Sequence, residues 1–103
     1  MQIKQMNGES LQVFAPDAAK SQVNTAVTGT KVFKKGTGAD FNITNWCCMR
    51  VVPTLASTYY FNTDSTKTMA MPANSVNDIW VIDPGITQVT LVLAAGTASV
   101  QGM

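Results

Sequence analysis

Turn-forming residues recur along the chain at intervals of about eight to fifteen residues, and this spacing limits the possible folds more than any other feature of the sequence. The turn signals combine Gly, Pro, Asn and Asp, and they occur at Asn7-Gly8, Pro16-Asp17, Gly29, Gly36-Thr37-Gly38, Pro53, Asn62-Thr63-Asp64, Pro72-Ala73-Asn74, Asp83-Pro84-Gly85 and Ala95-Gly96. Segments this short accommodate strands and leave little room for helices. The spacing therefore predicts a sandwich or barrel of short strands.

Apolar and polar residues alternate between these turns, which is the period of a half-buried strand. The alternation is clear in four stretches, at 10–13, 22–27, 88–93 and 97–101. We expect the last two stretches to form a hairpin through Ala94–Gly96. Two further candidate strands, Phe41–Val52 and Asp78–Ile82, carry apolar residues on both faces. This indicates the interior of a sheet or, for the longer one, a crossing between sheets.

Helical character is confined to one short stretch, where Pro16 and Asp17 could open a turn around Ala18-Ala19-Lys20. The apolar spacing of a helix ends soon afterwards, so we expect at most one short helical turn before Asn24. A length of 103 residues suits one domain with a modest core. The sequence thus predicts a single all-β domain over residues 1–103, either a small antiparallel β-sandwich or a jelly-roll-like barrel.

Charged residues make up only 13% of the chain, about half the usual share, so the surface must be largely uncharged. Seven Lys and Arg against six Asp and Glu give a net charge of +1, which disfavours nucleic acid as a partner. We find neither an apolar run long enough to span a bilayer nor a signal-type segment after Met1, and expect no membrane partner and synthesis in a cytoplasm. The low charge suits a chain that assembles, including as a homo-oligomer.

The chain has few residues that are suited to catalysis. There is no His, which excludes the usual general base near neutral pH and the commonest metal ligand. The six acidic residues mostly flank Gly, Pro or Asn, where side chains cap turns and face water. We therefore expect a protein that is not an enzyme, with no catalytic residue, no metal and no cofactor.

The two cysteines, Cys47 and Cys48, are adjacent. Neighbouring side chains of a strand point to opposite faces, so the pair could neither chelate one metal nor form a disulfide without severe distortion. Trp46-Cys47-Cys48-Met49 offers neither a general base nor a helix N-terminus to stabilise a thiolate. We expect two free thiols with a structural role.

Four aromatic residues, Trp46, Tyr59, Tyr60 and Trp80, could form a platform on which sugar rings stack, although core packing is the alternative that we favour. Tyr59 and Tyr60 must point to opposite faces of a strand, so one should be the more exposed. Tyr60 and Trp80 are our candidate interaction residues.

Three stretches carry a resemblance to a known group of proteins. They are Val27-Thr28-Gly29-Thr30-Lys31-Val32 leading to Gly38-Ala39-Asp40-Phe41-Asn42-Ile43, then Met71-Pro72-Ala73-Asn74, then Pro84-Gly85-Ile86-Thr87-Gln88-Val89 with Gly96-Thr97-Ala98-Ser99-Val100. In this order of strands and turns the chain resembles the small β-sandwich structural proteins of tailed bacteriophages, which include capsid decoration or cement proteins. The paired cysteines beside Trp46 and the long Ser57–Met71 region depart from that pattern.

The resemblance implies a virion structural protein, made in the host cytoplasm, that decorates and stabilises the outside of the head. Its partners would be the major capsid protein or other virion proteins, and a place in the tail or connector stays open. The resemblance assigns no site residue. Two alternatives remain: a carbohydrate- or receptor-binding module, including a tail-associated one, and then a minimal enzyme that works with Asp, Lys, Tyr or Cys alone.

Overall fold

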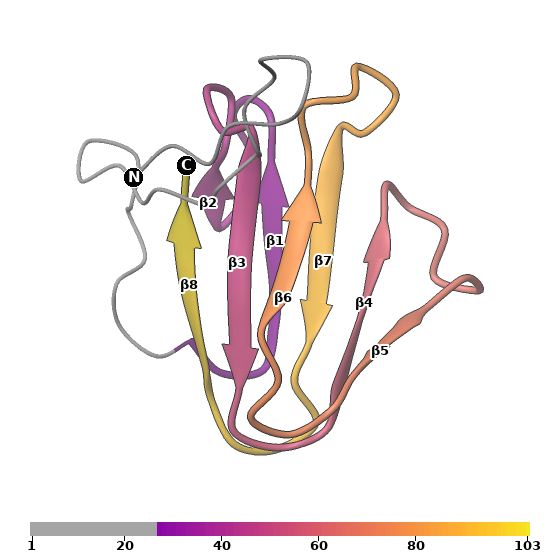
Figure 1. Ribbon diagram of the computed structural model, residues 1–103. Coiled ribbons are helices and arrows are strands. Elements are labelled where there is room, and N and C mark those ends of the chain that lie inside the picture. Colours follow the sequence, from indigo (N-terminus) through magenta and orange to yellow (C-terminus); the bar gives the residue numbers. More distant parts are fainter. Residues whose placement is uncertain (1–26) are drawn as a thin grey trace, which may run out of the picture.

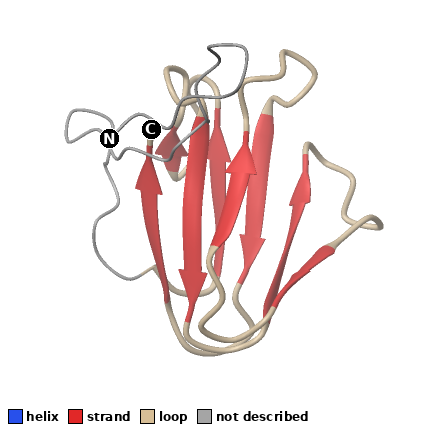
Figure 2. Ribbon diagram, viewed as in Figure 1, coloured by secondary structure: helices blue, strands red, loops and turns tan. Residues whose placement is uncertain are grey.

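The computed structural model describes residues 27–103, and in this part of the chain eight strands form two sheets (Figure 1). The strands are β1 (Thr30–Lys34), β2 (Phe41–Asn42), β3 (Cys48–Pro53), β4 (Ser57–Phe61), β5 (Met69–Met71), β6 (Asn77–Trp80), β7 (Gln88–Val92) and β8 (Ala98–Gly102). No helix occurs among the described residues (Figure 2), so the all-β prediction is confirmed. The helical turn expected after Pro16 and the strand expected at 10–13 lie outside the described residues.

Most successive strands pass from one sheet to the other, in the manner of a jelly roll, whereas β1 and β2 share a sheet, as do β4 and β5. The larger sheet has the order β2-β1-β7-β4-β5 and the smaller one the order β6-β3-β8. Val27 bridges Ala98 in the antiparallel sense, which places the chain ahead of β1 beside β8. With Val27 beside β8, the smaller sheet has the order Val27, β8, β3, β6 and the larger one the order β2, β1, β7, β4, β5. Apart from β2, this is the strand order of the two layers of a jelly roll.

The predicted hairpin through Ala94–Gly96 is wrong, because β7 and β8 belong to different sheets. Alternation of period two is the same for strands that pair and for strands that face each other across a core, so it could not separate these cases. Hydrogen bonds between Thr54 and Thr97 join the connection from β7 to β8 to the connection from β3 to β4. The Thr54 amide donates to the Thr97 carbonyl at 2.8 Å. In return the Thr97 amide donates to Thr54 Oγ1 at 2.9 Å.

The expected long strand Phe41–Val52 is divided into β2 and β3 by a turn. Asn42 makes this turn, since its Oδ1 accepts a hydrogen bond from the Thr44 amide at 2.9 Å. β2 also pairs parallel to β1, which departs from the expected antiparallel sandwich. Gly36 and Gly38 have positive φ angles, and they let the chain reverse twice between the two strands.

The core lies between the sheets and is filled by inward-facing side chains of the strands and of the segments that flank them. It comprises Val27, Phe33, Ile43, Trp46, Met49, Val51, Met71, Ile79, Val81, Val89, Leu91, Leu93, Ala98 and Val100. Phe33 stacks on Phe41 with ring centroids 4.7 Å apart. The Trp46 ring packs directly against the backbone of Gly102, where a Cβ would lie only 2.6 Å from the indole ring.

The inner face of the β4–β5 hairpin is covered unevenly. Ser57 and Met71, at one end of the hairpin, are buried, whereas Tyr59, Phe61 and Met69 are only half-buried. Figure 1 shows why: β4 and β5 lie to one side of β6 and diverge from it toward the end where Phe61 and Met69 are found. The larger sheet therefore extends past the edge of the smaller one.

Candidate binding surface

β6 is an edge strand with one open side. It pairs with β3 alone, and no other described strand lies against it. The Val81 amide donates to the Cys47 carbonyl at 2.8 Å, so the odd-numbered residues of β6 form the ladder with β3. Because backbone groups alternate in direction along an antiparallel strand, the N–H and C=O groups of Asp78 and Trp80 point to the open side. The prediction that Asp78–Ile82 is interior to a sheet is thus wrong.

The outer face of β6 and its two flanking residues carry an apolar row. Val76, Trp80 and Ile82 are exposed by 60%, 39% and 63%, and they are three of the four large apolar side chains that lie exposed in residues 27–103. Trp80 and Ile82 also line a shallow depression of about 500 Å³ together with Cys47 and Met103. We call Val76, Trp80 and Ile82 the β6 row.

Asp78 lies within the β6 row, where its charge is balanced by Arg50 of β3. Both carboxylate oxygens accept from the guanidinium, Oδ1 from Nε at 2.7 Å and Oδ2 from Nη2 at 2.9 Å. The hydrogen bond to Arg50 lowers the pKa of Asp78 below its ordinary value. The row therefore remains free of uncompensated charge.

Cys48 lies on the same outer face, opposite Trp80 in the pairing of β3 with β6. Burial, with a smaller contribution from the charge of Asp78, raises the pKa of the Cys48 thiol to about 11. Such a thiol stays protonated and is a poor nucleophile. Both cysteines are free, as expected from their adjacency.

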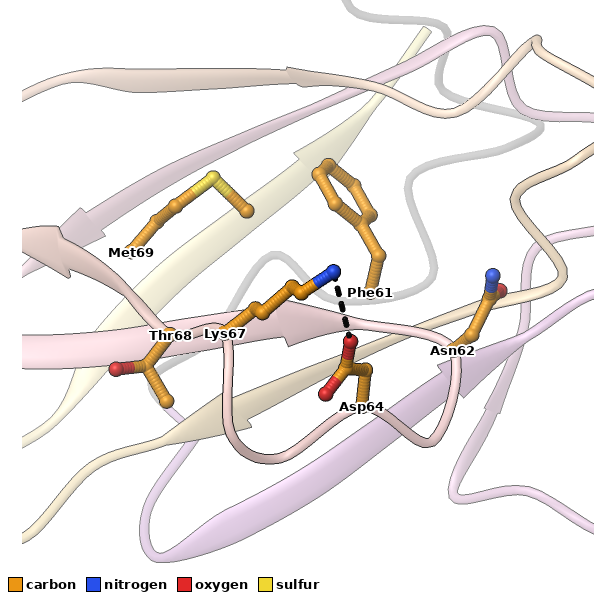
Figure 3. Close-up of a pocket in the computed structure, with 6 residues that line it drawn as sticks. All are labelled: Phe61, Asn62, Asp64, Lys67, Thr68 and Met69. Atoms are coloured by element: carbon orange, nitrogen blue, oxygen red, sulfur yellow. Dashed lines mark ion pairs between the residues drawn. The ribbon is translucent and has the colours of Figure 1, made fainter.

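A pocket of about 490 Å³ occupies the half-covered end of the β4–β5 hairpin (Figure 3). It is lined by Phe61, Asn62, Asp64, Lys67, Thr68 and Met69. Phe61, Lys67 and Met69 project to the same side of the hairpin, and Phe61 also contacts Tyr59 edge to face with ring centroids 5.7 Å apart. At the rim, Lys67 Nζ lies 3.7 Å from Asp64 Oδ2, an exposed ion pair that contributes little to stability. We call this the hairpin pocket.

The predicted interaction residues Tyr60 and Trp80 lie on opposite outer surfaces. Tyr60 projects from the outer face of the larger sheet, opposite Thr90, and Trp80 from the outer face of the smaller sheet. Tyr59 and Tyr60 point to opposite faces of β4, as expected, and Tyr59 points inward. Both tyrosines are half-buried, although one was expected to be the more exposed. Trp46 is buried in the core. The four aromatic residues therefore do not form one platform, and Tyr60 and Trp80 are separate candidates.

Sequence reasoning identified Trp80 and missed the rest of both surfaces. Val76 and Ile82 lie an even number of residues from Trp80, so in a strand they share its face. Apolar residues at these even-numbered positions are the signal that could have revealed the β6 row. No comparable signal marks Phe61, Lys67 and Met69, because the chain between them turns back on itself.

Residues 27–103 contain no group of three or more His, Cys, Asp or Glu placed to hold a metal ion. In the same residues there is no helix of the length and apolar character needed to cross a membrane. The sequence matches no protein-family model, no curated protein and no solved structure.

Proposed function

We propose that the chain is a non-enzymatic structural protein of a bacteriophage particle, a decoration protein that binds the outside of the head and stabilises it. The observation that carries the proposal is the β6 row, an apolar surface on an edge strand. Such a surface suits attachment to another protein. The jelly-roll order of the sheets adds support, because capsid domains of many viruses share it.

Low charge also supports attachment over a broad surface. Thr and other uncharged side chains dominate the outer face of the larger sheet, where Thr58, Tyr60 and Thr90 lie in adjacent strands. Uncharged groups lose less solvation on burial than charged ones do. Many equivalent sites on a symmetric shell would compensate for a weak individual contact.

The test uses heads assembled without this chain, from the major capsid protein of the phage that encodes it. Purified chain is mixed with heads and separated on a gradient, and the bound copies per head are counted. We expect saturation at a copy number set by the capsid symmetry and a higher melting temperature of the heads. Binding no greater than that of an unrelated β-domain of equal size would remove the proposal.

The hairpin pocket favours a second candidate, a carbohydrate-binding module. Sugars stack their C–H faces on aromatic rings and bind carboxylate and ammonium groups through their hydroxyls, and Phe61, Asp64 and Lys67 supply these groups. A glycan array would then give signals that Phe61→Ala abolishes and that Tyr60→Ala, on the other face of β4, leaves intact. A silent array would eliminate this candidate.

A further inference from the structure

We propose that the open side of β6 is a strand-addition site, where an extended segment of a partner protein pairs with β6 and covers the hairpin pocket. The inference deepens the proposed function and rests on it for the identity of the partner as a virion protein. The site itself is argued from β6, the β6 row and the β4–β5 hairpin alone.

The backbone of β6 specifies an extended occupant. Asp78 and Trp80 each direct one N–H and one C=O group to the open side, and no hydrogen bond in residues 27–103 uses them. Only a segment in β conformation presents donors and acceptors at the matching spacing. An irregular loop or a helix would leave these four groups unpaired.

The larger sheet provides the inner lining of the site. Neighbouring strands lie about 4.8 Å apart, and stacked sheets about 10 Å apart. A strand placed beside β6 would therefore continue the smaller sheet over β4 and β5, which extend past β6 in Figure 1. Its inward side chains would meet Tyr59, Phe61 and Met69, which are half-buried without it. The pocket of about 490 Å³ leaves room for large apolar side chains.

The outer face determines the rest of the occupant's chemistry. The outward side chains of the added strand would lie beside the β6 row, where cross-strand pairs of apolar and β-branched residues are favourable. Asp78 and Asp64 are each paired with a cation, so the site selects no particular charge. The fitting partner is an uncharged segment rich in Val, Ile, Thr or aromatic residues.

A second copy whose β6 pairs antiparallel with this β6 does not fit the site. Antiparallel pairing of two β6 strands requires a two-fold axis perpendicular to the smaller sheet, so both larger sheets would lie on the same side. Because each larger sheet extends past its β6, the two β4–β5 hairpins would then occupy the same space. A single extended segment avoids this clash.

The test begins with a short capped peptide in which Val and Leu alternate with Thr between terminal Lys residues. Its control has the same composition with the apolar residues contiguous. We expect the alternating peptide to slow hydrogen exchange at the Asp78 and Trp80 amides and to shift the resonances of Phe61 and Met69. Protection at the β5 edge instead, or unchanged exchange at both amides under millimolar peptide, would overturn the proposal.

Two variants separate the backbone from the side chains. Trp80→Pro removes the open-side N–H without touching the ladder to β3, and Trp80→Ala keeps the N–H while losing the same ring. We expect Trp80→Pro to bind the peptide at least tenfold more weakly than Trp80→Ala. If Trp80→Pro does not fold, Met69→Lys, which places a charge at the pocket, serves instead and should weaken binding by a similar factor. Equal binding by the wild type and the folded variant would contradict the site.

The same variants then distinguish this inference from the proposed function. Heads that bind Trp80→Pro, or Met69→Lys in its place, as well as the wild type would overturn strand addition and leave the decoration role standing. Heads that bind no form of the chain, together with peptide binding at β6, would remove the decoration role and support the site.

Discussion

Asn62 and Thr87 are joined by two hydrogen bonds, because Asn62 Oδ1 accepts from both the amide and the hydroxyl of Thr87, at 2.8 and 3.0 Å. The Asn62 amide group also donates to the Gly85 carbonyl at 3.0 Å. These contacts tie the end of β4 to the turn between β6 and β7. Asn62 has a φ of 55°, a conformation that Asn tolerates better than most residues. This clamp forms one side of the hairpin pocket.

Replacing Asn62 should loosen the clamp in two separable ways. Asn62→Ala loses the side-chain hydrogen bonds. It also puts Ala, whose side chain cannot form a local hydrogen bond, at a positive φ angle. We expect a loss of about 2 kcal/mol in the free energy of unfolding. Asn62→Gly loses the same hydrogen bonds without the strain, so it should be less destabilising by about 1 kcal/mol. Denaturant unfolding measures both, and equal stability of the two variants would argue against backbone strain at this position.

The β class was predictable because turns and alternation are local properties of the chain. Which strands pair was not, since alternation at 88–93 and 97–101 is the same whether the strands share a sheet or face each other. The site was predictable only in part. Trp80 was identified as an aromatic residue on which a sugar ring could stack. Phe61 and Met69 line a pocket only because β4 and β5 extend past β6.

Gly102 lies so close to Trp46 that its lack of a side chain should be essential to core packing. A Cβ there would fall 2.6 Å from two carbons of the indole ring. We expect Gly102→Ala to destabilise the fold by about 1–3 kcal/mol through overpacking. Combining it with Trp46→Phe should recover part of this loss relative to the sum of the single changes, as measured by a double-mutant cycle. Strict additivity would mean that the two residues do not compete for space.

The pair of Arg50 and Asp78 predicts a pH dependence of stability. The hydrogen bond to Arg50 places the pKa of Asp78 in the fold below its unfolded value of about 4, so the pair stabilises the fold above that pH. This contribution is lost as the pH falls through the folded pKa. Both side chains are about one-third exposed, so it should amount to less than about 1 kcal/mol. Asp78→Asn, which cannot ionise, should therefore differ from the wild type at neutral pH and converge with it in acid. A constant difference across the range would contradict the pair's role.

The protein should become more stable when Thr90 is replaced by a residue of the same shape that lacks the hydroxyl. Thr90 is buried between Val32 and Tyr60 on adjacent strands, and its Oγ1 has no hydrogen-bond partner within residues 27–103. An unsatisfied buried hydroxyl is unfavourable, so Thr90→Val should raise the free energy of unfolding by about 1 kcal/mol. Thr58→Val, a half-exposed position on the same face, is the matched control and should change stability little. A destabilised Thr90→Val would show that the hydroxyl is satisfied in solution.

The two cysteines should differ sharply in reactivity although they are adjacent. Burial raises the pKa of Cys48 to about 11, so its thiolate is scarce at neutral pH, and the side chain is enclosed. Cys47 is half-buried and lines the depression beside Trp80. Iodoacetamide should therefore modify Cys47 well before Cys48 in the folded protein, as read by peptide mass spectrometry. In denaturant the two rates should become similar, because the difference arises from burial in the fold. If Cys48 reacted first in the folded protein, the packing of β3 beneath the β6 row would have to be open in solution.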